Sequence, residues 1–295
     1  MALPFDLRAL SVFVTVVEQG SFSAAARVQH TAQSAVSQTI AGLERRLDTP
    51  LFHRQDRRIA LTPEGEVLLE HARQLLTQAD AAQLAMSELK GLVKGEVRIG
   101  IPSMLGSYYL PPLLMGFKSS HPGIQLTVIE AGARRLQGLI AERKLDLGII
   151  VDDKGGPEME RHPLLTEEMV VCVPSEHHFA ERNSVRPQDF FAETLVLFQD
   201  GYFHREFVDQ MAERLNMRPD IAFQSNLIPL TKAIVRQGFG ITTFLRRVID
   251  EPGLKAVSFD PPTWLTLSLA WQHGSYLSRA ERAFIDYAIA HSNFL

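Results

Sequence analysis

The chain has 295 residues, of which 45% are hydrophobic and 22% are charged, with a net charge of −4. These are the proportions of an ordinary globular protein long enough for two domains. No apolar run approaches the roughly 20 residues that span a bilayer, and the N-terminus has no signal-peptide pattern, so we expect a cytoplasmic protein without a membrane segment.

The first predicted element is a helix from Asp6 to about Glu18. Asp6 is a good N-cap, Gly20 is placed to end the helix, and the apolar residues between them recur at helical spacing. One face of this helix should therefore pack against a core.

Two further helices follow closely. Ser23 can cap a short helix over residues 24–29, and Thr31 can cap a third helix that ends before Pro50. The third helix opens with glutamine and serine side chains instead of apolar ones. This is the layout of a helix-turn-helix whose second helix reads base edges in the DNA major groove.

Residues 52–61 fit a short hairpin with a polar tip, which would form a wing beside the helices. Thr62-Pro63-Glu64 then starts a new helix, because it supplies an N-cap, a proline for the first turn and an acidic side chain at the positive helix end.

This helix carries an apolar seam whose members are alternately four and three residues apart. A narrow seam with small alanines suits contact with a second copy of the same helix, and packing on its own domain is the alternative. The seam predicts dimerisation through Leu68, Ala72, Leu75, Ala79, Ala82, Met86 and Leu89. Gly91 and Gly95 would end the helix and form a hinge.

From Glu96 onward, predicted strands alternate with predicted helices. The strands are residues 97–101, 125–129, 147–151, 169–173, 194–197, 241–243 and 265–269. The helices are residues 109–120, 133–143, 204–215, 226–237 and 277–292. This alternation predicts an α/β domain with largely parallel sheets, arranged as one large sheet or as two small lobes.

Motifs of common enzymes and metal sites are missing from the sequence. It has no Gly-x-x-x-x-Gly-Lys phosphate loop, no Gly-x-Ser-x-Gly elbow, no His-Glu-x-x-His and no paired cysteines. Cys172 lies in an apolar run and is interpreted as a core residue. His177 and His178 would diverge on a strand, and a surface loop is expected there. We therefore predict no enzyme activity, no cofactor and no metal site.

One set of residues carries a family resemblance over essentially the whole chain. It consists of Phe13-Val14, Glu18, Gly20-Ser-Phe-Ser-Ala-Ala-Ala26, Gln33-Ser-Ala-Val-Ser-Gln38, Ile40, Leu43-Glu44, Leu47, Leu51-Phe52, Arg54 and Leu61-Thr-Pro-Glu-Gly65. With this set the chain resembles the LysR-type transcriptional regulators. Such regulators are homodimers that pair into homotetramers on double-stranded DNA upstream of a promoter.

The resemblance also implies an α/β fold class with three parts. The first is an all-α winged helix-turn-helix over residues 1–62, followed by a linker and dimerisation helix with a hinge over 63–94. The third is a two-lobed, periplasmic-binding-protein-like (type 2) effector domain over 95–295. Lobe I would span about 95–164 and 268–295, and lobe II about 165–267.

Positions that match the family's DNA-binding helix and wing are predicted to contact DNA. They are Thr31, Gln33, Ser34, Ser37, Gln38, Arg54, Arg57 and Arg58. The chemistry agrees, because glutamine pairs bidentately with adenine and serine serves bases or phosphates. For Arg57 and Arg58 a solvated turn is an equal alternative. The first 62 residues carry a net charge of only +2, so a local patch has to make the phosphate contacts.

The predicted effector site lies where strands end and helices begin, since helix N-termini offer free N–H groups to an anion. Its residues are Ser103, Met104, Gly132, Ala133, Tyr202, Phe203, His204 and Asn226. Many family members have serine or threonine where Ala133 stands, so one side-chain donor is missing. The aromatic side chains could instead be ordinary packing, and His204 could be a surface histidine. A small organic acid is the expected effector.

Three other functions compete with control of transcription by an effector. An enzyme lacks supporting motifs, and an exported solute-binding protein would have no use for residues 1–90. An effector-independent DNA-bending regulator is the remaining alternative. In the preferred mechanism, ligand binding shifts the lobe arrangement, which changes how the tetramer bends DNA and how RNA polymerase gains access.

Overall fold

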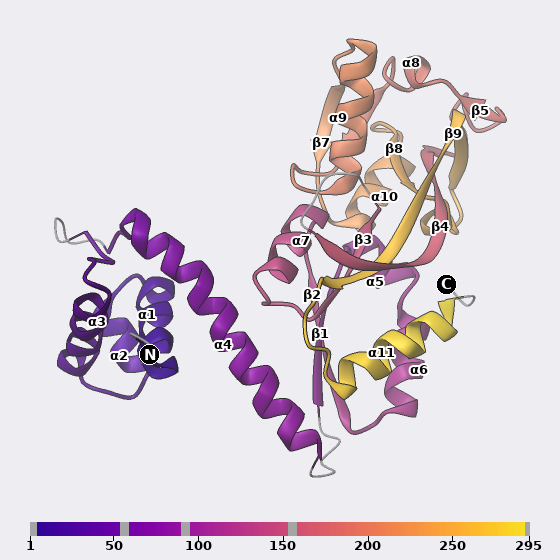
Figure 1. The fold of residues 1–295 in the computed structure, drawn as a ribbon. Helices are drawn as coiled ribbons and strands as arrows, with labels where there is room; N and C mark the ends of the chain where they lie inside the picture. Colours follow the sequence, from indigo (N-terminus) through magenta and orange to yellow (C-terminus); the bar gives the residue numbers. More distant parts are fainter. Residues whose placement is uncertain (1–4, 54–58, 90–94, 153–157, 293–295) are drawn as a thin grey trace. The chain divides into compact units, whose positions relative to one another are not determined.

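The computed structural model describes residues 5–53, 59–89, 95–152 and 158–292 (Figure 1). Its contacts divide the chain into two compact units, residues 1–92 and 93–295. The described part of the first unit is helical except for one short bridge between extended segments, and the second unit is an α/β fold.

The first unit starts with three helices, α1 (Leu7–Gln19), α2 (Phe22–Val28) and α3 (Gln33–Leu47). The predicted cap of α1 is confirmed, since the Asp6 carboxylate accepts a hydrogen bond from the Ala9 N–H at 2.8 Å. Gly20 ends this helix with a φ of 60°, a left-handed conformation that glycine adopts without steric penalty.

The predicted caps of the next two helices are wrong. Ser21 caps α2, with its hydroxyl accepting from the Ala24 N–H at 3.4 Å, because the helix starts two residues before the predicted position after Ser23. Ala32 is the N-cap of α3 and makes no side-chain bond, so Thr31 lies one residue too early to cap it. The first N–H groups of α3 therefore lack a side-chain acceptor at the cap.

Phe52 connects these helices to the expected wing. Its ring lies 5.5 Å from the ring of Phe13 and 5.7 Å from that of Phe22, measured between centroids. Phe52 also forms an antiparallel bridge with Leu61. The base of the hairpin is therefore present, whereas its tip, with Arg54, Arg57 and Arg58, lies outside the described residues.

The long helix α4 (Pro63–Leu89) starts as predicted, with Thr62 Oγ1 accepting from the Gly65 N–H at 3.0 Å. The first part of its apolar seam packs inside its own unit. Ala72 is fully buried, and Leu68 lies against the same core. The predicted dimerisation role is therefore wrong for Ala72, which has no surface left for a second chain.

Further along α4 the seam faces solvent. Leu75 is 41% exposed and Met86 is 60% exposed, with Ala82 also at the surface and Ala79 partly so. The side chain of Leu89 is outside what the structure describes. The seam thus begins in the core of the helix-turn-helix and continues as an uncovered apolar stripe.

The second unit is built on a mixed seven-stranded sheet in the order β2-β1-β3-β9-β4-β8, with β5 also pairing with β9. Its strands are β1 (Gly95–Ile101), β2 (Ile124–Glu130), β3 (Leu147–Val151), β4 (Met159–Pro174), β5 (Ser184–Val185), β8 (Thr242–Leu245) and β9 (Leu254–Gln272). A second, parallel sheet consists of β6 (Thr194–Leu197) and β7 (Asp220–Gln224).

The expectation of largely parallel sheets is wrong in one respect. β1 is parallel to β2 and β3, but β9 runs antiparallel to β3 and β4, and β4 runs antiparallel to β8. The reason is that β4 and β9 are long strands that pass together from one lobe to the other (Figure 1). They are shared by the two lobes and connect them.

Helices cover the sheets of both lobes. They are α5 (Ser103–Tyr108), α6 (Pro111–Ser120), α7 (Ala133–Ala141), α8 (Pro187–Phe190), α9 (Phe203–Leu215), α10 (Ile228–Arg236), the 3-10 helix η1 (Arg246–Ile249) and α11 (Arg279–Ala290). The helix predicted over 109–120 is confirmed as α6, which starts two residues later at Pro111, whereas the short helix α5 before it was not predicted.

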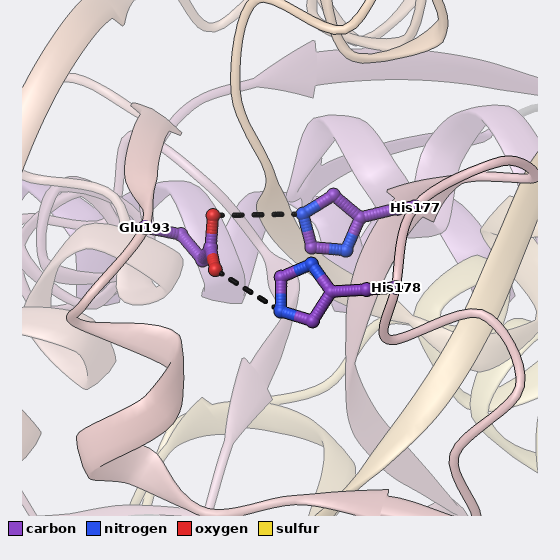
Figure 2. Close-up of side chains that lie close together, drawn as sticks. All are labelled: His177, His178 and Glu193. Atoms are coloured by element: carbon purple, nitrogen blue, oxygen red, sulfur yellow. Dashed lines mark ion pairs between the residues drawn. The ribbon is translucent and has the colours of Figure 1, made fainter.

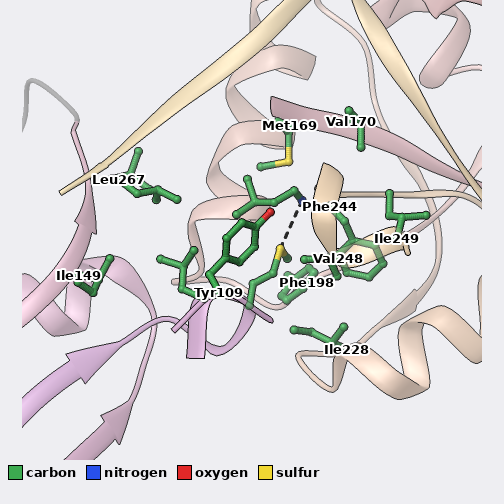
Figure 3. Packing of buried hydrophobic residues seen from close by; sticks show 14 of the residues in the cluster. Tyr109, Ile149, Met169, Val170, Phe198, Ile228, Phe244, Val248, Ile249 and Leu267 are labelled. Atoms are coloured by element: carbon green, nitrogen blue, oxygen red, sulfur yellow. Dashed lines mark hydrogen bonds between the residues drawn. The ribbon is translucent and has the colours of Figure 1, made fainter. Parts of the chain in front are cut away.

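A continuous hydrophobic core joins the second unit. Phe198, Phe244 and Val170 meet in it beside the buried ring of Tyr109 (Figure 3). Cys172 is fully buried in β4, as predicted for a core residue, and this burial raises the pKa of its thiol to about 12. The thiol is therefore protonated at neutral pH and unreactive.

Within the described ranges, no single helix is both long and apolar enough to cross a membrane. By length and composition alone, the pair formed by α1 and α2 would pass the same test, although it is bent by 119°.

Candidate functional site

The start of α3 presents a polar face to the surrounding solvent. Gln33, Ser34 and Gln38 are exposed, and Ser37 is partly exposed. The Gln33 amide donates a hydrogen bond to the Ser37 hydroxyl at 3.2 Å. This bond places two of the predicted base-reading side chains next to each other on one turn of the helix.

The opposite face of α3 holds this polar face in place. Val36, Ile40 and Leu43 are at most 2% exposed in the core of the first unit. Glu44 adds an anchor at the far end, where its carboxylate accepts a hydrogen bond from the Leu51 N–H at 2.8 Å. The polar side chains therefore stand on a rigid support.

A small cavity lies between the two lobes of the second unit, where strands end and helices begin. It is lined by Pro102, Ser103, Met104, Leu105, Gly132, Ala133, Val151, Tyr202, Phe203, His204, Leu245, Leu265 and Leu267. Seven of the eight residues predicted for the effector site are among them. The cavity volume is about 30 Å³, which is the space of a single water molecule.

The lobes are in contact around this cavity. A Cβ atom added to Gly132 would lie 2.0 Å from the Gly201 carbonyl oxygen of the other lobe. The Arg134 guanidinium lies 3.3 Å from the Glu206 carboxylate, which pairs α7 with α9. The structure therefore shows a closed arrangement, and only a residue without a side chain fits at Gly132.

Three helices begin at the cavity wall. Their N-cap residues are Pro102 for α5, Gly132 for α7 and Tyr202 for α9, and none of the three helices has a side-chain cap bond. Uncapped N-terminal N–H groups and helix dipoles both favour negative charge. The cavity wall therefore combines apolar side chains with a positive electrostatic potential from the backbone.

His204 is a partly buried polar group at this wall. Its ring stacks on Phe198 at a centroid distance of 4.8 Å, and its Nε2 atom is screened from solvent without a hydrogen-bond partner among the described residues. Burial lowers the pKa of His204 to about 3, so the ring is neutral at pH 7. The alternative of a surface histidine is therefore wrong.

Asn226 is the one predicted effector residue that does not line the cavity. Its side-chain amide pairs with Gln199, accepting from the Gln199 N–H and donating to the Gln199 side chain, both at 2.9 Å. Both hydrogen-bonding groups of the amide are thus engaged in fixing a loop. The role predicted for Asn226 at the cavity is wrong for this arrangement.

The apolar residues of the cavity wall were not predicted from the sequence. Val151, Leu265 and Leu267 belong to predicted strands, and Leu245 lies just beyond one. Val151 and Leu245 end β3 and β8, and this position was the available signal, because side chains at strand ends face the crevice between lobes. Leu265 and Leu267 lie inside β9 and gave no such signal.

His177 and His178 form a separate cluster with Glu193 in the second lobe. Their two rings stack, with centroids 4.4 Å apart, and both Nε2 atoms face the Glu193 carboxylate (Figure 2). The segment is a loop after β4, as expected, and its turns allow neighbouring side chains to point the same way.

Two family models match the chain. The model of the LysR substrate binding domain matches residues 90–293, and that of the bacterial regulatory helix-turn-helix proteins of the lysR family matches residues 7–66. One model matches within the first unit, and the other matches nearly all of the second.

Individual proteins are similar over comparable lengths. The HTH-type transcriptional regulator CysL of Bacillus subtilis is 28% identical over 242 residues, covering 82% of this chain and 81% of that protein. A full-length OxyR variant from Pseudomonas aeruginosa has a TM-score of 0.73 at 23% identity, covering 96% of this chain and 94% of that chain. The effector binding domain of QuiR in complex with shikimate has a TM-score of 0.59 at 24% identity, covering 68% and 97%.

Proposed function

This chain belongs to the LysR family of DNA-binding transcriptional regulators, and on that premise we propose that a small carboxylate, bound between its lobes, controls how a dimer reads DNA through α3. The observation that carries the proposal is the meeting of three uncapped helix N-termini with a neutral, unpartnered His204 at one cavity.

The proposed base contacts come from the polar face of α3. Gln33 and Ser37 supply donors and acceptors that suit major-groove base edges, with roughly 1–3 kcal/mol of discrimination for each good pair. Their mutual hydrogen bond orders both side chains before DNA is bound. Ser34, Gln38 and Thr31 stand beside them at the surface and suit phosphate or base contacts.

The wing would contribute phosphate contacts through Arg54, with Arg57 and Arg58 at its tip. The base of the wing is tied to α1 by the contact of Phe52 with Phe13, and Phe52 pairs with Leu61. Replacing Arg54 with alanine should weaken binding to specific and random DNA alike, and should flatten the dependence of affinity on salt.

A carboxylate fits the cavity chemistry better than a cation or a sugar. Helix N-termini attract negative charge, and the neutral ring of His204 adds one polar atom for the same ligand. Leu265, Leu267 and Phe203 would surround its apolar part. The effector binding domain of QuiR, which has a similar fold, binds shikimate, and shikimate is itself a carboxylate.

The closed cavity implies a population shift. With a volume of about 30 Å³ it has no room for an organic acid, so the ligand has to bind an arrangement in which the Gly132–Gly201 contact is open. A ligand that prefers this arrangement changes the balance by its difference in affinity for the two forms. In a dimer or tetramer the shift would alter the imposed DNA bend and the access of RNA polymerase.

Self-association is proposed through the second half of α4. Leu75, Ala82 and Met86 form an exposed apolar stripe that continues the seam beyond the helix-turn-helix core. A second α4 would cover this stripe, and homodimers could pair further into tetramers.

The alternative function is an effector-independent DNA-bending regulator. Two observations favour this alternative. The closed cavity has room for about one water molecule, and Ala133 offers no hydroxyl group to a ligand. It differs from the main proposal in one testable respect, namely whether any small molecule binds the second unit.

A thermal-shift titration of the full chain tests the proposal. Each of a panel of carboxylic acids is compared with its primary amide, which has nearly the same shape without the charge. We expect at least one acid, but not its amide, to raise the unfolding temperature. A response confined to amines or sugars, or no response to any compound, would contradict it.

A further inference from the structure

The cluster of His177, His178 and Glu193 lies in the second lobe and does not line the cavity between the lobes. His177 Nε2 is 3.6 Å from one oxygen of Glu193, and His178 Nε2 is 3.4 Å from the other. One potential ligand atom from each residue lies within 4.8 Å of the other two. Neither the DNA-reading face nor the cavity uses these side chains.

The local backbone accounts for this convergence. The His177 N–H donates to the Pro174 carbonyl at 3.0 Å, and the Ala180 N–H donates to the His177 carbonyl at 2.8 Å. These turns bring both imidazoles to the same side, and the buried ring of Phe179 anchors the segment in the core. Glu193 approaches from the start of β6, so two separate segments of the chain supply the three side chains.

We propose that His177, His178 and Glu193 bind one divalent transition-metal ion of the Zn²⁺ type. Two imidazoles and one carboxylate are a ligand set that Zn²⁺ accepts, while Mg²⁺ and Ca²⁺ prefer oxygen ligands only. Ligands at about 2.0–2.2 Å from a tetrahedral ion lie roughly 3.3–3.5 Å from one another, close to the two measured separations. Small side-chain rotations would bring all three ligand atoms onto one ion.

Exposure leaves a fourth position for water. The side chain of His178 is 56% exposed, that of Glu193 28% and that of His177 16%. An ion could therefore enter from solvent and keep one water ligand.

One hydrogen bond opposes the ion and limits its affinity. The Phe179 N–H donates to His177 Nδ1 at 3.2 Å, which places the ring proton on Nε2. Coordination through Nε2 moves that proton to Nδ1 and breaks the bond. We therefore expect an exchangeable ion, bound more weakly than in closed four-ligand structural sites.

Zinc binding to the chelator-treated full chain, with any affinity tag removed, tests the proposal. The chain is titrated with Zn²⁺ in competition with a chromophoric chelator. We expect one site in the wild-type protein, with affinity at least tenfold lower in His178→Ala and in Glu193→Gln. Both side chains are partly exposed, so normal circular dichroism and metal-free unfolding temperatures should confirm that the variants fold.

His273→Ala is the matched control, because His273 also pairs with a carboxylate, Glu160 at 3.1 Å, but belongs to no three-residue cluster among the described residues. It should bind Zn²⁺ as the wild type does. Equal Zn²⁺ affinity in the wild type and both cluster variants, no binding by the wild type, or an equal loss in the control would each overturn the proposal. DNA binding and the carboxylate response are independent of this result.

Discussion

The polar face of α3 and the cavity between the lobes are built in opposite ways. Gln33, Ser34 and Gln38 are exposed on a helix whose other face is packed, so they are ready for a partner without rearrangement. The cavity is enclosed by apolar side chains and touching lobes, and has room for about one water molecule. A preformed surface can give specificity, while a closed site can act as a switch only by opening.

Gly132→Ala should have the largest effect, because it would prevent the cavity from closing. The added methyl group would lie 2.0 Å from the Gly201 carbonyl oxygen and hold the lobes apart. The lobes of the variant should therefore stay open without any ligand, and we expect the effector to change the lobe arrangement little or not at all. Small-angle scattering of the second unit with and without the effective acid measures this.

Gly138→Ala in the same helix is the control, because nothing lies within 4 Å of a Cβ atom at that position. It should keep the wild-type response and gain a little helix stability. A wild-type response in Gly132→Ala would show that the lobe contact is not part of the switch.

His204→Phe tests whether the His204 ring is shielded from water in the closed cavity, through the dependence of the free energy of unfolding on pH. The folded-state pKa of His204 is about 3, below the unfolded value near 6.5, so the unfolded chain binds more protons between these values. The wild type therefore loses stability as pH falls from about 6.5 to about 3, by up to about 5 kcal/mol.

Phenylalanine keeps the stacking on Phe198 and removes the proton site, so the variant should be less sensitive to acid over this interval. Denaturant unfolding at pH 7 and pH 4 measures the difference. Parallel losses of stability in wild type and variant would mean that the His204 ring is open to water.

Met86→Lys tests whether the protein dimerises through the exposed apolar stripe of α4, so that two DNA-reading faces act together. Burying a methionine side chain contributes about 1.5–3 kcal/mol, so its loss should weaken dimerisation at least tenfold. Val67→Lys is a matched control, because Val67 is also 60% exposed but lies roughly 100° away around α4. Sedimentation equilibrium of both variants decides, and equal weakening by the two changes would argue against the stripe.

Gln33→Ala should have the smallest effect, roughly 1–3 kcal/mol, and it should be confined to the cognate operator. Binding to random DNA should stay nearly unchanged, because phosphate contacts remain. Gel shifts at fixed salt compare the two DNAs, with the exposed Gln74→Ala on α4 as control. Equal loss on both DNAs would remove Gln33 from base reading.

The same contrast explains what could be predicted from sequence. The helix-turn-helix could be predicted because its signals are local. They are the Asp6 cap, the Gly20 helix end and the apolar faces of short helices, and the structure confirms them. The errors are small shifts: Ser21 and Ser23 are both able to cap, and only packing decides between them.

The second unit depends more on long-range contacts. β7 was missed because most of its side chains are exposed and it lacks an apolar alternation, and the first half of β9 was missed because it carries Pro261 and Pro262. The predicted effector residues at helix starts were placed by the family resemblance and a rule of topology, and seven of the eight line the cavity. Burial of His204 and the pairing of Asn226 with Gln199 were not predicted, because both depend on neighbours distant in space.

The most direct measurement is a footprint of the full chain on its operator, made with an acid that raises the unfolding temperature and again with the amide of that acid. Because a carboxylate in the cavity is proposed to change how the dimer holds DNA, the acid should change the protected length or the sites of enhanced cleavage, and the amide should not. Identical footprints with acid, amide and no ligand would contradict the account and favour an effector-independent DNA-bending regulator.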